Sequence, residues 1–159
     1  MSQLEFRFAQ PGDEELVLFF IRQLAEYEHA LEEVIATAEQ LRDQLFVRKH
    51  AEVVFAMIDE QEIGLALFFH NFSTWLGRAG IYLEDLFVLP EYRGKGVGKA
   101  LLAKLAQIAV ERDCGRLEWS CLDWNEPSLN FYRSLGATSL DEWVGFRLEG
   151  ASLEQLASL

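Results

Sequence analysis

A glycine-rich basic loop lies near the middle of the chain, with the sequence Arg93-Gly-Lys-Gly-Val-Gly98. It follows an apolar stretch, Tyr82–Val88, and overlaps the start of a segment with helical apolar spacing, Val97–Arg112. Backbone N–H groups at a helix N-terminus lack intrahelical acceptors, and the helix dipole adds positive potential there. The pattern therefore predicts an anion site, and a phosphate is the expected anion.

Two adjacent acids, Glu84 and Asp85, interrupt the apolar stretch before this loop. An acid inside an apolar strand is seldom fully buried unless it is partnered or functional. Strand alternation places Glu84 on the face of Tyr82, Leu86 and Val88 and Asp85 on the opposite face, so both point into one cleft only if the strand contains a bulge. The two acids therefore either belong to a buried ion-paired network or take part in chemistry.

The glycine loop can be compared with known phosphate-binding patterns. It is not a Walker A loop, because Lys99 is followed by Ala100 rather than Ser or Thr. It is not a dinucleotide fingerprint either, because its three glycines are spaced G-x-G-x-G. The spacing that fits is Arg93-x-x-Gly96-x-Gly98.

Three segments together, Leu24–Glu28, Tyr82–Gly98 and Trp124–Ala137, give the chain a family resemblance that covers nearly its whole length. The chain resembles the GNAT family of acetyl-CoA-dependent N-acetyltransferases, and within it the spermidine/spermine (diamine) and thialysine N-acetyltransferase group. The resemblance implies a single GNAT domain over residues 1–159. Its implied α/β (α+β) fold has a mixed, mostly antiparallel central sheet, splayed between strands 4 and 5, with helices on both faces.

The resemblance implies acetyl-CoA as co-substrate. Pantetheine is expected to bond backbone groups where the two strands separate, and pyrophosphate to rest on the amides of the glycine loop, where a Cβ would obstruct the approach. Arg93 and Lys95 either add charge there or are only solvated, and Asn125 and Ser128 either contact the cofactor or only cap a helix. The predicted cofactor-binding residues are Leu86, Phe87, Val88, Arg93, Gly94, Lys95, Gly96, Val97, Gly98, Lys99, Asn125 and Ser128.

The implied acceptor is a primary amine of a small cationic molecule. An alkylammonium with a pKa of about 10.4 offers little free base at neutral pH, so transfer needs a proton acceptor. The resemblance gives this role to Glu84, with Asp85 as a supporting acid. The predicted substrate-binding residues are Tyr27, Glu28, Glu84, Asp85, Glu118 and Trp119. The structural alternatives are a solvated Glu28 beside a half-buried Tyr27, and a Trp119 that belongs to the core.

Transfer also needs an acid for the departing thiolate, and Tyr132 matches the tyrosine that the family uses. A phenol with a pKa of about 10 is mostly protonated at neutral pH and can donate to a developing thiolate. Packing alone is the alternative for this side chain. The predicted catalytic residues are thus Glu84 and Tyr132.

The chain departs from the polyamine enzymes near its C-terminus. Those enzymes have an acid before a Gly-Trp-Arg segment, whereas this chain reads Val144-Gly-Phe-Arg147, with Asp141 and Glu142 close by. The difference weakens a polyamine acceptor relative to a thialysine-like amino acid. Two further alternatives stay open: a GNAT enzyme that acts on a protein lysine or N-terminus, and a non-catalytic module that senses acetyl-CoA.

Composition limits the partners. The formal net charge of −12 over 159 residues opposes binding to nucleic acid or anionic membranes and suits a cationic small molecule, although solubility explains the charge equally well. No apolar run has the length of a membrane span, and the N-terminus lacks a signal pattern, so a cytoplasmic location is expected. Cys114 and Cys121 have no metal-ligand spacing and the histidines are scattered, so no metal is predicted. The family commonly forms homodimers, which is the expected assembly.

Several elements must position these residues. A helix capped by Asp13 is expected to place Phe19, Phe20 and Tyr27 on one apolar face. Thr37 and Gln40 form a capping box. The expected strands are Leu4–Phe8, Glu52–Ile58, Ile63–Phe69, Tyr82–Val88, Arg116–Leu122 and one or more within Ser139–Glu149, with a turn-rich connection over Asn71–Gly80, a helix Pro127–Leu135 ended by Gly136, and a last helix opening at Ser152.

Overall fold

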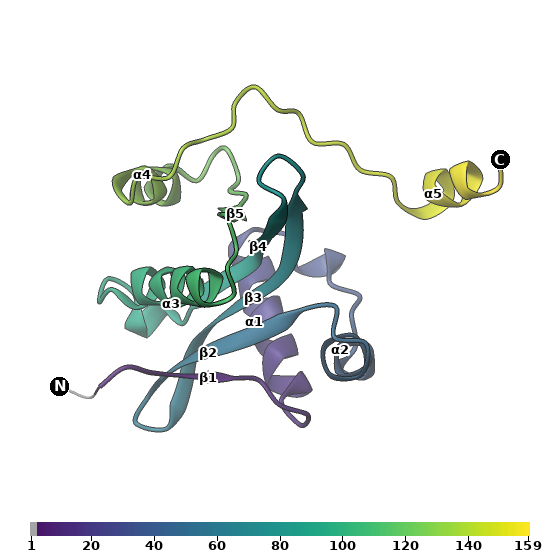
Figure 1. Cartoon of the computed structure of the whole chain (residues 1–159). Helices are drawn as coiled ribbons and strands as arrows, with labels where there is room; N and C mark the ends of the chain where they lie inside the picture. Colours follow the sequence, from purple (N-terminus) through teal and green to yellow (C-terminus); the bar gives the residue numbers. More distant parts are fainter. Residues whose placement is uncertain (1–2) are drawn as a thin grey trace. The chain divides into compact units, whose positions relative to one another are not determined.

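A computed structural model describes residues 3–159. They form two compact units, residues 3–120 and residues 121–159 (Figure 1). The first unit contains a five-stranded sheet in the order β1-β2-β3-β4-β5. Its strands are β1 (Glu5–Phe8), β2 (Glu52–Ile58), β3 (Gln61–Ser73), β4 (Arg78–Val88) and β5 (Leu117–Trp119). The first four strands pair antiparallel and β4 pairs parallel with β5, so the predicted mixed, mostly antiparallel sheet is confirmed.

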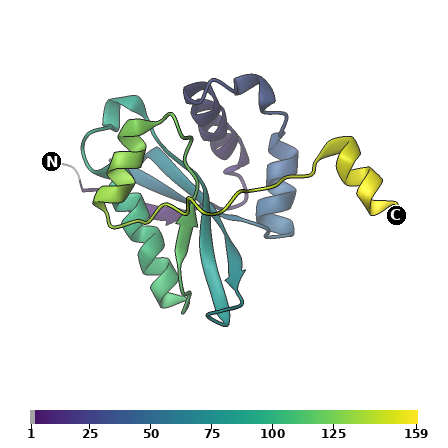
Figure 2. The same cartoon turned by 90° about the horizontal axis from the view of Figure 1, so that it is seen from above.

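Helices cover both faces of this sheet. They are α1 (Glu14–Tyr27), α3 (Val97–Glu111) and a short α2 (Ala38–Arg42) that continues as a π-helical turn, Asp43–Val47, with single 3-10 turns at Leu31–Glu33 and Pro90–Tyr92. In the view from above, α1 and α3 lie on opposite sides of the strands (Figure 2). Both contact β3 and β4.

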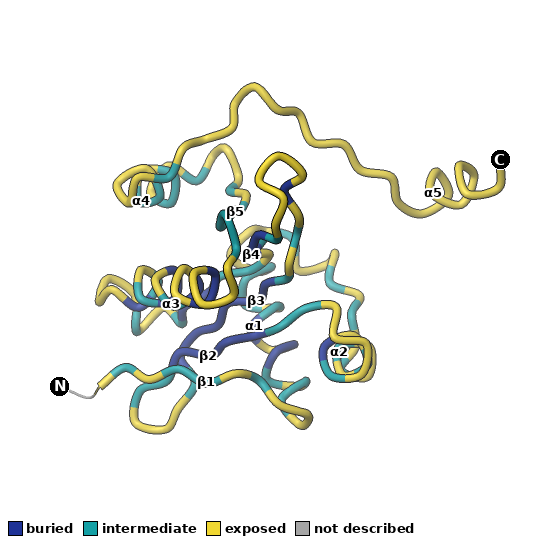
Figure 3. Tube along the Cα trace, in the orientation of Figure 1, coloured by how far each residue is buried: buried dark blue, intermediate teal, exposed yellow. Residues whose placement is uncertain are grey.

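The core consists of two apolar layers, one on each face of the sheet. On the α1 face, Val17 and Phe20 pack with Leu65, Leu67 and Phe87. The buried residues of the first unit gather along the strands and on the helix surfaces that meet them (Figure 3). Two residues predicted for the apolar face of α1 are exposed, Phe19 at 46% and Tyr27 at 41%. The buried side of α1 runs through Val17, Leu18 and Phe20 instead.

Both hairpins differ from their predicted limits. Asp59 and Glu60 alone connect β2 to β3, with φ of 52° and 63°, so this loop has two residues rather than four. Such a turn, left-handed at both positions, matches the twist of the adjoining strands. The connection predicted over Asn71–Gly80 is wrong, because β3 and β4 pair as far as Ser73 and Arg78. Backbone pairing between adjacent strands prevails there over polar composition.

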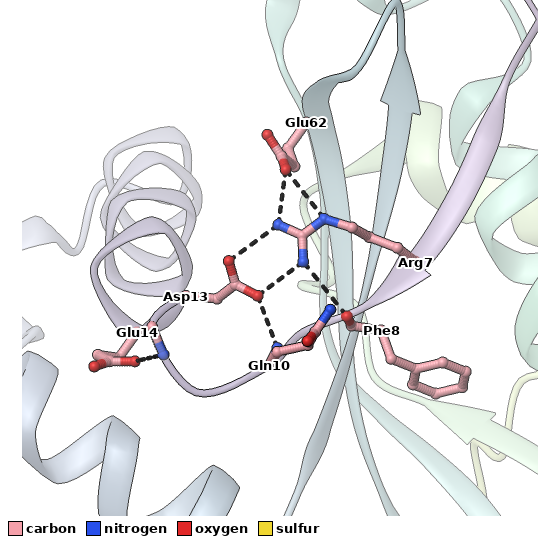
Figure 4. Close-up of polar contacts among 7 residues, drawn as sticks. Arg7, Phe8, Gln10, Asp13, Glu14 and Glu62 are labelled. Atoms are coloured by element: carbon pink, nitrogen blue, oxygen red, sulfur yellow. Dashed lines mark hydrogen bonds and ion pairs between the residues drawn. The ribbon is translucent and has the colours of Figure 1, made fainter.

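The helix starts were predicted with mixed success. The Thr37–Gln40 capping box is confirmed, with backbone-to-side-chain distances of 3.2 and 3.0 Å. Asp13 gives no side-chain cap to α1. Its carboxylate accepts hydrogen bonds from the Arg7 guanidinium and from the Gln10 backbone N–H instead (Figure 4).

The second unit, residues 121–159, contains α4 (Glu126–Ser134) and α5 (Gly150–Ala157). Asn125 caps α4 by accepting from the Ser128 N–H at 3.4 Å, and Gly136 has the left-handed φ of 90° expected of a helix terminator. The strand predicted within Ser139–Glu149 is wrong, since the described part of this unit contains no strand pairing. No helix within residues 3–159 is long and apolar enough to cross a membrane.

Candidate active site

A β-bulge in β4 positions the two central acids. Leu67 of β3 pairs with Asp85, and the next residue, Phe68, pairs with Leu83, so Glu84 has no partner across the ladder. Asp85 consequently shares a face with Leu67 and the helix α1, while Leu83 lies on the opposite face. Simple alternation, which put Leu83 and Asp85 on one face, was wrong at this point. The bulge is the condition under which both acids can serve one site.

Three carboxylates are electrostatically coupled around this bulge. Burial raises the pKa of Asp85 to about 6, and the negative charges of Glu84 and Glu28 add to the rise. Burial also raises the pKa of Glu28, which directly follows α1. Within residues 3–159 none of the three carboxylates forms an ion pair. Such a group of unpaired acids favours a cationic ligand, because a cation would replace repulsion by attraction.

The open edge of β4 begins beside these acids. Its pairing with β5 ends at Leu83 and Trp119, whereas β4 continues to Val88. The Tyr82 hydroxyl and the Ser120 Oγ are joined by a 2.6 Å hydrogen bond at the point where the strands separate. The splay predicted between the fourth and fifth strands is therefore present in the first unit. It leaves the β4 backbone around Leu86–Val88 without a strand partner on that side.

The glycine loop follows this edge and enters α3. Gly94 and Gly96 have φ of 75° and 84°, a left-handed conformation that favours glycine. Gly96 is the N-cap of α3 and has no side chain to satisfy the first-turn amides, and the first turn contains no acid. A Cβ on Gly98 would meet nothing within 4 Å. Internal packing therefore does not explain this glycine, and open space over free amides fits a pyrophosphate.

The two cations of the loop both lie on aromatic rings. The Arg93 Nε donates to the Val88 carbonyl at 2.8 Å, and its guanidinium lies over the rings of Phe87 and Tyr27 at 4.9 and 5.2 Å. The Lys95 ammonium lies 5.5 Å from the Tyr92 ring centroid. The contact of Arg93 with Tyr27 joins the loop to the end of α1, and nothing in the sequence pattern indicated it.

Glu118 differs from the acids of the bulge because its carboxylate already has partners. It accepts from the Asn71 side-chain amide at 2.9 Å and forms an ion pair with Arg116 at 2.9 Å. Trp119 is half-buried beside it on β5. A substrate-binding role for Glu118 and Trp119 stays a prediction, and for Glu118 it would require sharing the carboxylate with Asn71 and Arg116.

The remaining predicted residues lie in the second unit. Asn125 and Ser128 are bonded to each other at the first turn of α4, and Tyr132 lies one turn further along, its ring centroid 5.5 Å from that of Phe131. Their roles toward a cofactor or thiolate stay predictions. In the first unit, by contrast, Glu28, Glu84 and Asp85 are brought together from two separate elements.

A family comparison identifies the fold and its chemistry. The profile of the acetyltransferase (GNAT) family matches residues 16–137. The chain belongs to the GNAT acetyltransferase family. The prediction that it is an N-acetyltransferase is thereby confirmed, and so is the fold class.

The named relatives of this GNAT acetyltransferase include a thialysine acetyltransferase and a spermidine/spermine acetyltransferase-like protein. It is 38% identical to the thialysine N-epsilon-acetyltransferase of Bos taurus over 99% of both chains. It is 29% identical, over its whole length but 24% of the other protein, to the spermidine/spermine N(1)-acetyltransferase-like protein 1 of Homo sapiens. A solved integron cassette protein from the mobile metagenome of V. cholerae superposes with a TM-score of 0.82 at 30% identity, covering 100% of this chain and 99% of that one.

Proposed function

We propose that this enzyme transfers the acetyl group of acetyl-CoA to the primary amine of a thialysine-like amino acid. The observation that carries the proposal is the unpaired acid cluster formed by Glu28, Glu84 and Asp85 beside the open edge of β4. A cationic amine bound there would lie next to the strand edge on which a thioester would be held. The 38% identity to a thialysine acetyltransferase over almost the whole chain supports the same acceptor.

The cofactor would lie along the open edge and on the glycine loop. Backbone groups at Leu86, Phe87 and Val88 would bond its extended arm, and the amides from Arg93 to Lys99 would hold its pyrophosphate. Asn125 and Ser128 would add contacts from α4. When bound, acetyl-CoA supplies an activated acetyl thioester.

The acids of the bulge would accept a proton from the ammonium and so produce a neutral amine. Glu84, which is exposed, would receive the ammonium, and its proton would pass, directly or through water, to the Glu84–Asp85 pair. Asp85 suits this step because its pKa of about 6 lies near working pH. The amine nitrogen would then form the new C–N bond as the C–S bond breaks, and the Tyr132 hydroxyl would give its proton to the departing thiolate sulfur. The amide nitrogen would lose its second proton, which would restore the Tyr132 phenol.

A polyamine is the second candidate acceptor, because one relative is named for spermidine and spermine. Val144 makes a polyamine acceptor less favoured, because the polyamine enzymes have an acid at the position before the segment that matches Gly145–Arg147. The acceptor class is therefore the first matter to test.

We further propose that the enzyme acts in the cytoplasm as a homodimer. No disulfide joins Cys114 and Cys121 in the described chain, which suits a reducing compartment. Large apolar side chains of the C-terminal segment are exposed, with Trp143 at 75% and Phe146 at 95%. A second copy of the chain is a suitable cover for such residues.

The proposal is tested by thiol release from acetyl-CoA with thialysine, lysine, putrescine, spermidine and a basic peptide as acceptors. We expect turnover with thialysine and a smaller rate with the diamines. The Tyr132→Phe variant should lose most of kcat while binding acetyl-CoA as before. Glu111→Gln, an acid at the far end of α3, is the matched control and should behave as the unmodified enzyme.

Three results would overturn the proposal. Preference for the basic peptide over all small amines would indicate a protein acceptor. Binding of acetyl-CoA without thiol release from any acceptor would indicate a sensing module. Full activity in Tyr132→Phe would remove that residue from the mechanism.

A further inference from the structure

Arg93 makes contacts that a phosphate ligand would not need. It is the first residue of the glycine loop, yet its side chain extends back toward the end of β4 and the end of α1. Its Nε is bonded to the Val88 carbonyl, and its guanidinium lies over rings from two different elements, Phe87 of β4 and Tyr27 of α1. One side chain thus connects the loop, the sheet edge and the helix that precedes Glu28.

The geometry requires an arginine in particular. A planar guanidinium can lie on aromatic rings and donate from its edge at the same time, and the Arg93 group does both. A lysine offers a single strongly hydrated ammonium, which cannot contact two rings while holding a carbonyl at the original distance. Lysine is therefore a poor replacement here, although it conserves the charge.

Tyr27 is the last residue of α1, and Glu28 follows it directly. The Arg93 guanidinium lies over both Tyr27 and Phe87, so the end of α1 lies close to β4 two residues beyond Asp85. A contact that holds the Tyr27 ring therefore helps to hold Glu28 near Asp85. The Arg93 guanidinium lies over that ring, 5.2 Å from its centroid.

We propose that Arg93 is a positioning residue of the acceptor site, which holds Tyr27 and thereby Glu28 against the Glu84–Asp85 bulge. The inference rests on the proposed function, because it assigns the acid cluster to the amine. It also makes the two substrates interdependent. A cofactor seated on the loop fixes the loop's first residue, and that residue fixes one wall of the amine site.

This connection implies a reciprocal effect on binding. If acetyl-CoA improves the affinity for the amine, the amine must improve the affinity for acetyl-CoA by the same factor. Removal of the Arg93 side chain should abolish both effects together. A residue that only neutralised phosphate charge would instead change the affinity for acetyl-CoA whether or not an amine is present.

The kinetic test compares Arg93→Met and Arg93→Lys with the unmodified enzyme, with thialysine as acceptor. We expect both variants to raise the KM for thialysine about tenfold, with the Kd of acetyl-CoA measured without amine changed less than about twofold. Tyr27→Leu should raise KM similarly, and the double variant with Arg93→Met should add little further. Arg112→Met is the matched control, because Arg112 also lies over a phenylalanine, Phe68, and is paired with Glu52 outside this site.

A second test does not depend on turnover. Amide hydrogen exchange is measured over residues 20–30 with and without acetyl-CoA. Slower exchange on binding in the unmodified enzyme, lost in Arg93→Met, supports the proposal even if the acceptor is not thialysine. The proposal is overturned if Arg93→Met weakens acetyl-CoA binding by about as much as it raises KM, or if acetyl-CoA leaves the exchange of this segment unchanged.

Discussion

Two groups of acids in the first unit are built in opposite ways. Asp13 and Glu62 both bind the guanidinium of Arg7, which lies between them (Figure 4). Glu84 and Asp85 gather with a third acid around the bulge and have no cation of the described chain in an ion pair. The fold neutralises charge in the first group and leaves it uncompensated in the second.

The difference between the two groups is seen in their ion-pair distances and in the directions of their pKa shifts. The Arg7 guanidinium lies 2.8 Å from the Asp13 carboxylate and 2.7 Å from that of Glu62. The hydrogen bond from Arg7 is the main cause that lowers the pKa of Asp13, whereas burial raises the pKa of Asp85 to about 6. The arginine group, which consists of Arg7, Asp13 and Glu62, joins β1, the start of α1 and the β2–β3 hairpin. It therefore stabilises the fold. The bulge group, which consists of Glu28, Glu84 and Asp85, destabilises the folded state at neutral pH because its charges repel one another. Such a cost is expected at a site that binds a cationic ligand.

The largest expected effect is on activity, which variants of the bulge acids should lose and a variant of Asp13 should keep. Glu84→Gln or Asp85→Asn should lower kcat/KM for the amine by about 100-fold to 10,000-fold, because each removes an acid that binds or deprotonates the ammonium. Asp13→Asn should leave kcat/KM within about threefold, since it acts only on stability. Steady-state kinetics at pH 7.5 checks both. Equal losses in all three variants would mean that the bulge acids are structural.

The next effect concerns the arginine group. Arg7→Met should lower the free energy of unfolding by about 2 to 4 kcal/mol, because two partly buried carboxylates lose their cation and repel each other. Urea unfolding at pH 7.5 measures the change. Arg22→Met, an exposed arginine on α1, is the control and should change stability by less than about 0.5 kcal/mol. Unchanged stability in Arg7→Met would show that this network contributes nothing to the fold.

The third prediction is a gain in the free energy of unfolding, where Arg7→Met gives a loss. The folded-state pKa of Asp85 is raised, so its contribution to stability is present below the unfolded pKa of about 3.9 and is lost as pH rises through about 6. Asp85→Asn should therefore stabilise the protein by about 1 to 3 kcal/mol at pH 7.5 and give no gain at pH 4. Unfolding curves of both proteins across this range provide the test. A destabilised Asp85→Asn at pH 7.5 would refute the assignment of an unpaired acid.

The smallest effect on the fold is expected in the glycine loop. Gly98→Ala should leave the unfolding free energy within about 1 kcal/mol of the original, since a Cβ meets open space and alanine favours helix. Its methyl group should nonetheless weaken acetyl-CoA binding about fivefold to tenfold by separating phosphate from backbone. Calorimetric titration gives the Kd. Unchanged affinity would mean that the phosphate lies elsewhere.

Local features were the part of this fold that the sequence could predict. The bounds of β2 agree with the prediction, and the Thr37 capping box and the Asn125 cap both form. Each depends on residues within a few positions of one another. The glycine loop and the two acids, Glu84 and Asp85, could also be selected as candidates from the sequence, because such residues are unusual where they occur.

Features set by distant partners could not be predicted in the same way. The bulge at Glu84 depends on the register of β4 against β3, and one shifted pair moves Asp85 to the other face. The contact between Arg93 and Tyr27 joins residues far apart in sequence. The segment Ser139–Glu149 has strand-like apolar residues but no strand to pair with in its own unit, so composition misled there.

Carbon-13 NMR titration of the carboxyl groups tests most directly whether the bulge acids bind a cationic amine. Asp85 should titrate with a pKa near 6, while Asp13 titrates below its ordinary value. Saturating thialysine should lower the pKa of Asp85 and leave that of Asp13 unchanged. An Asp85 pKa near the ordinary value of about 3.9, unmoved by the amine, would contradict the account.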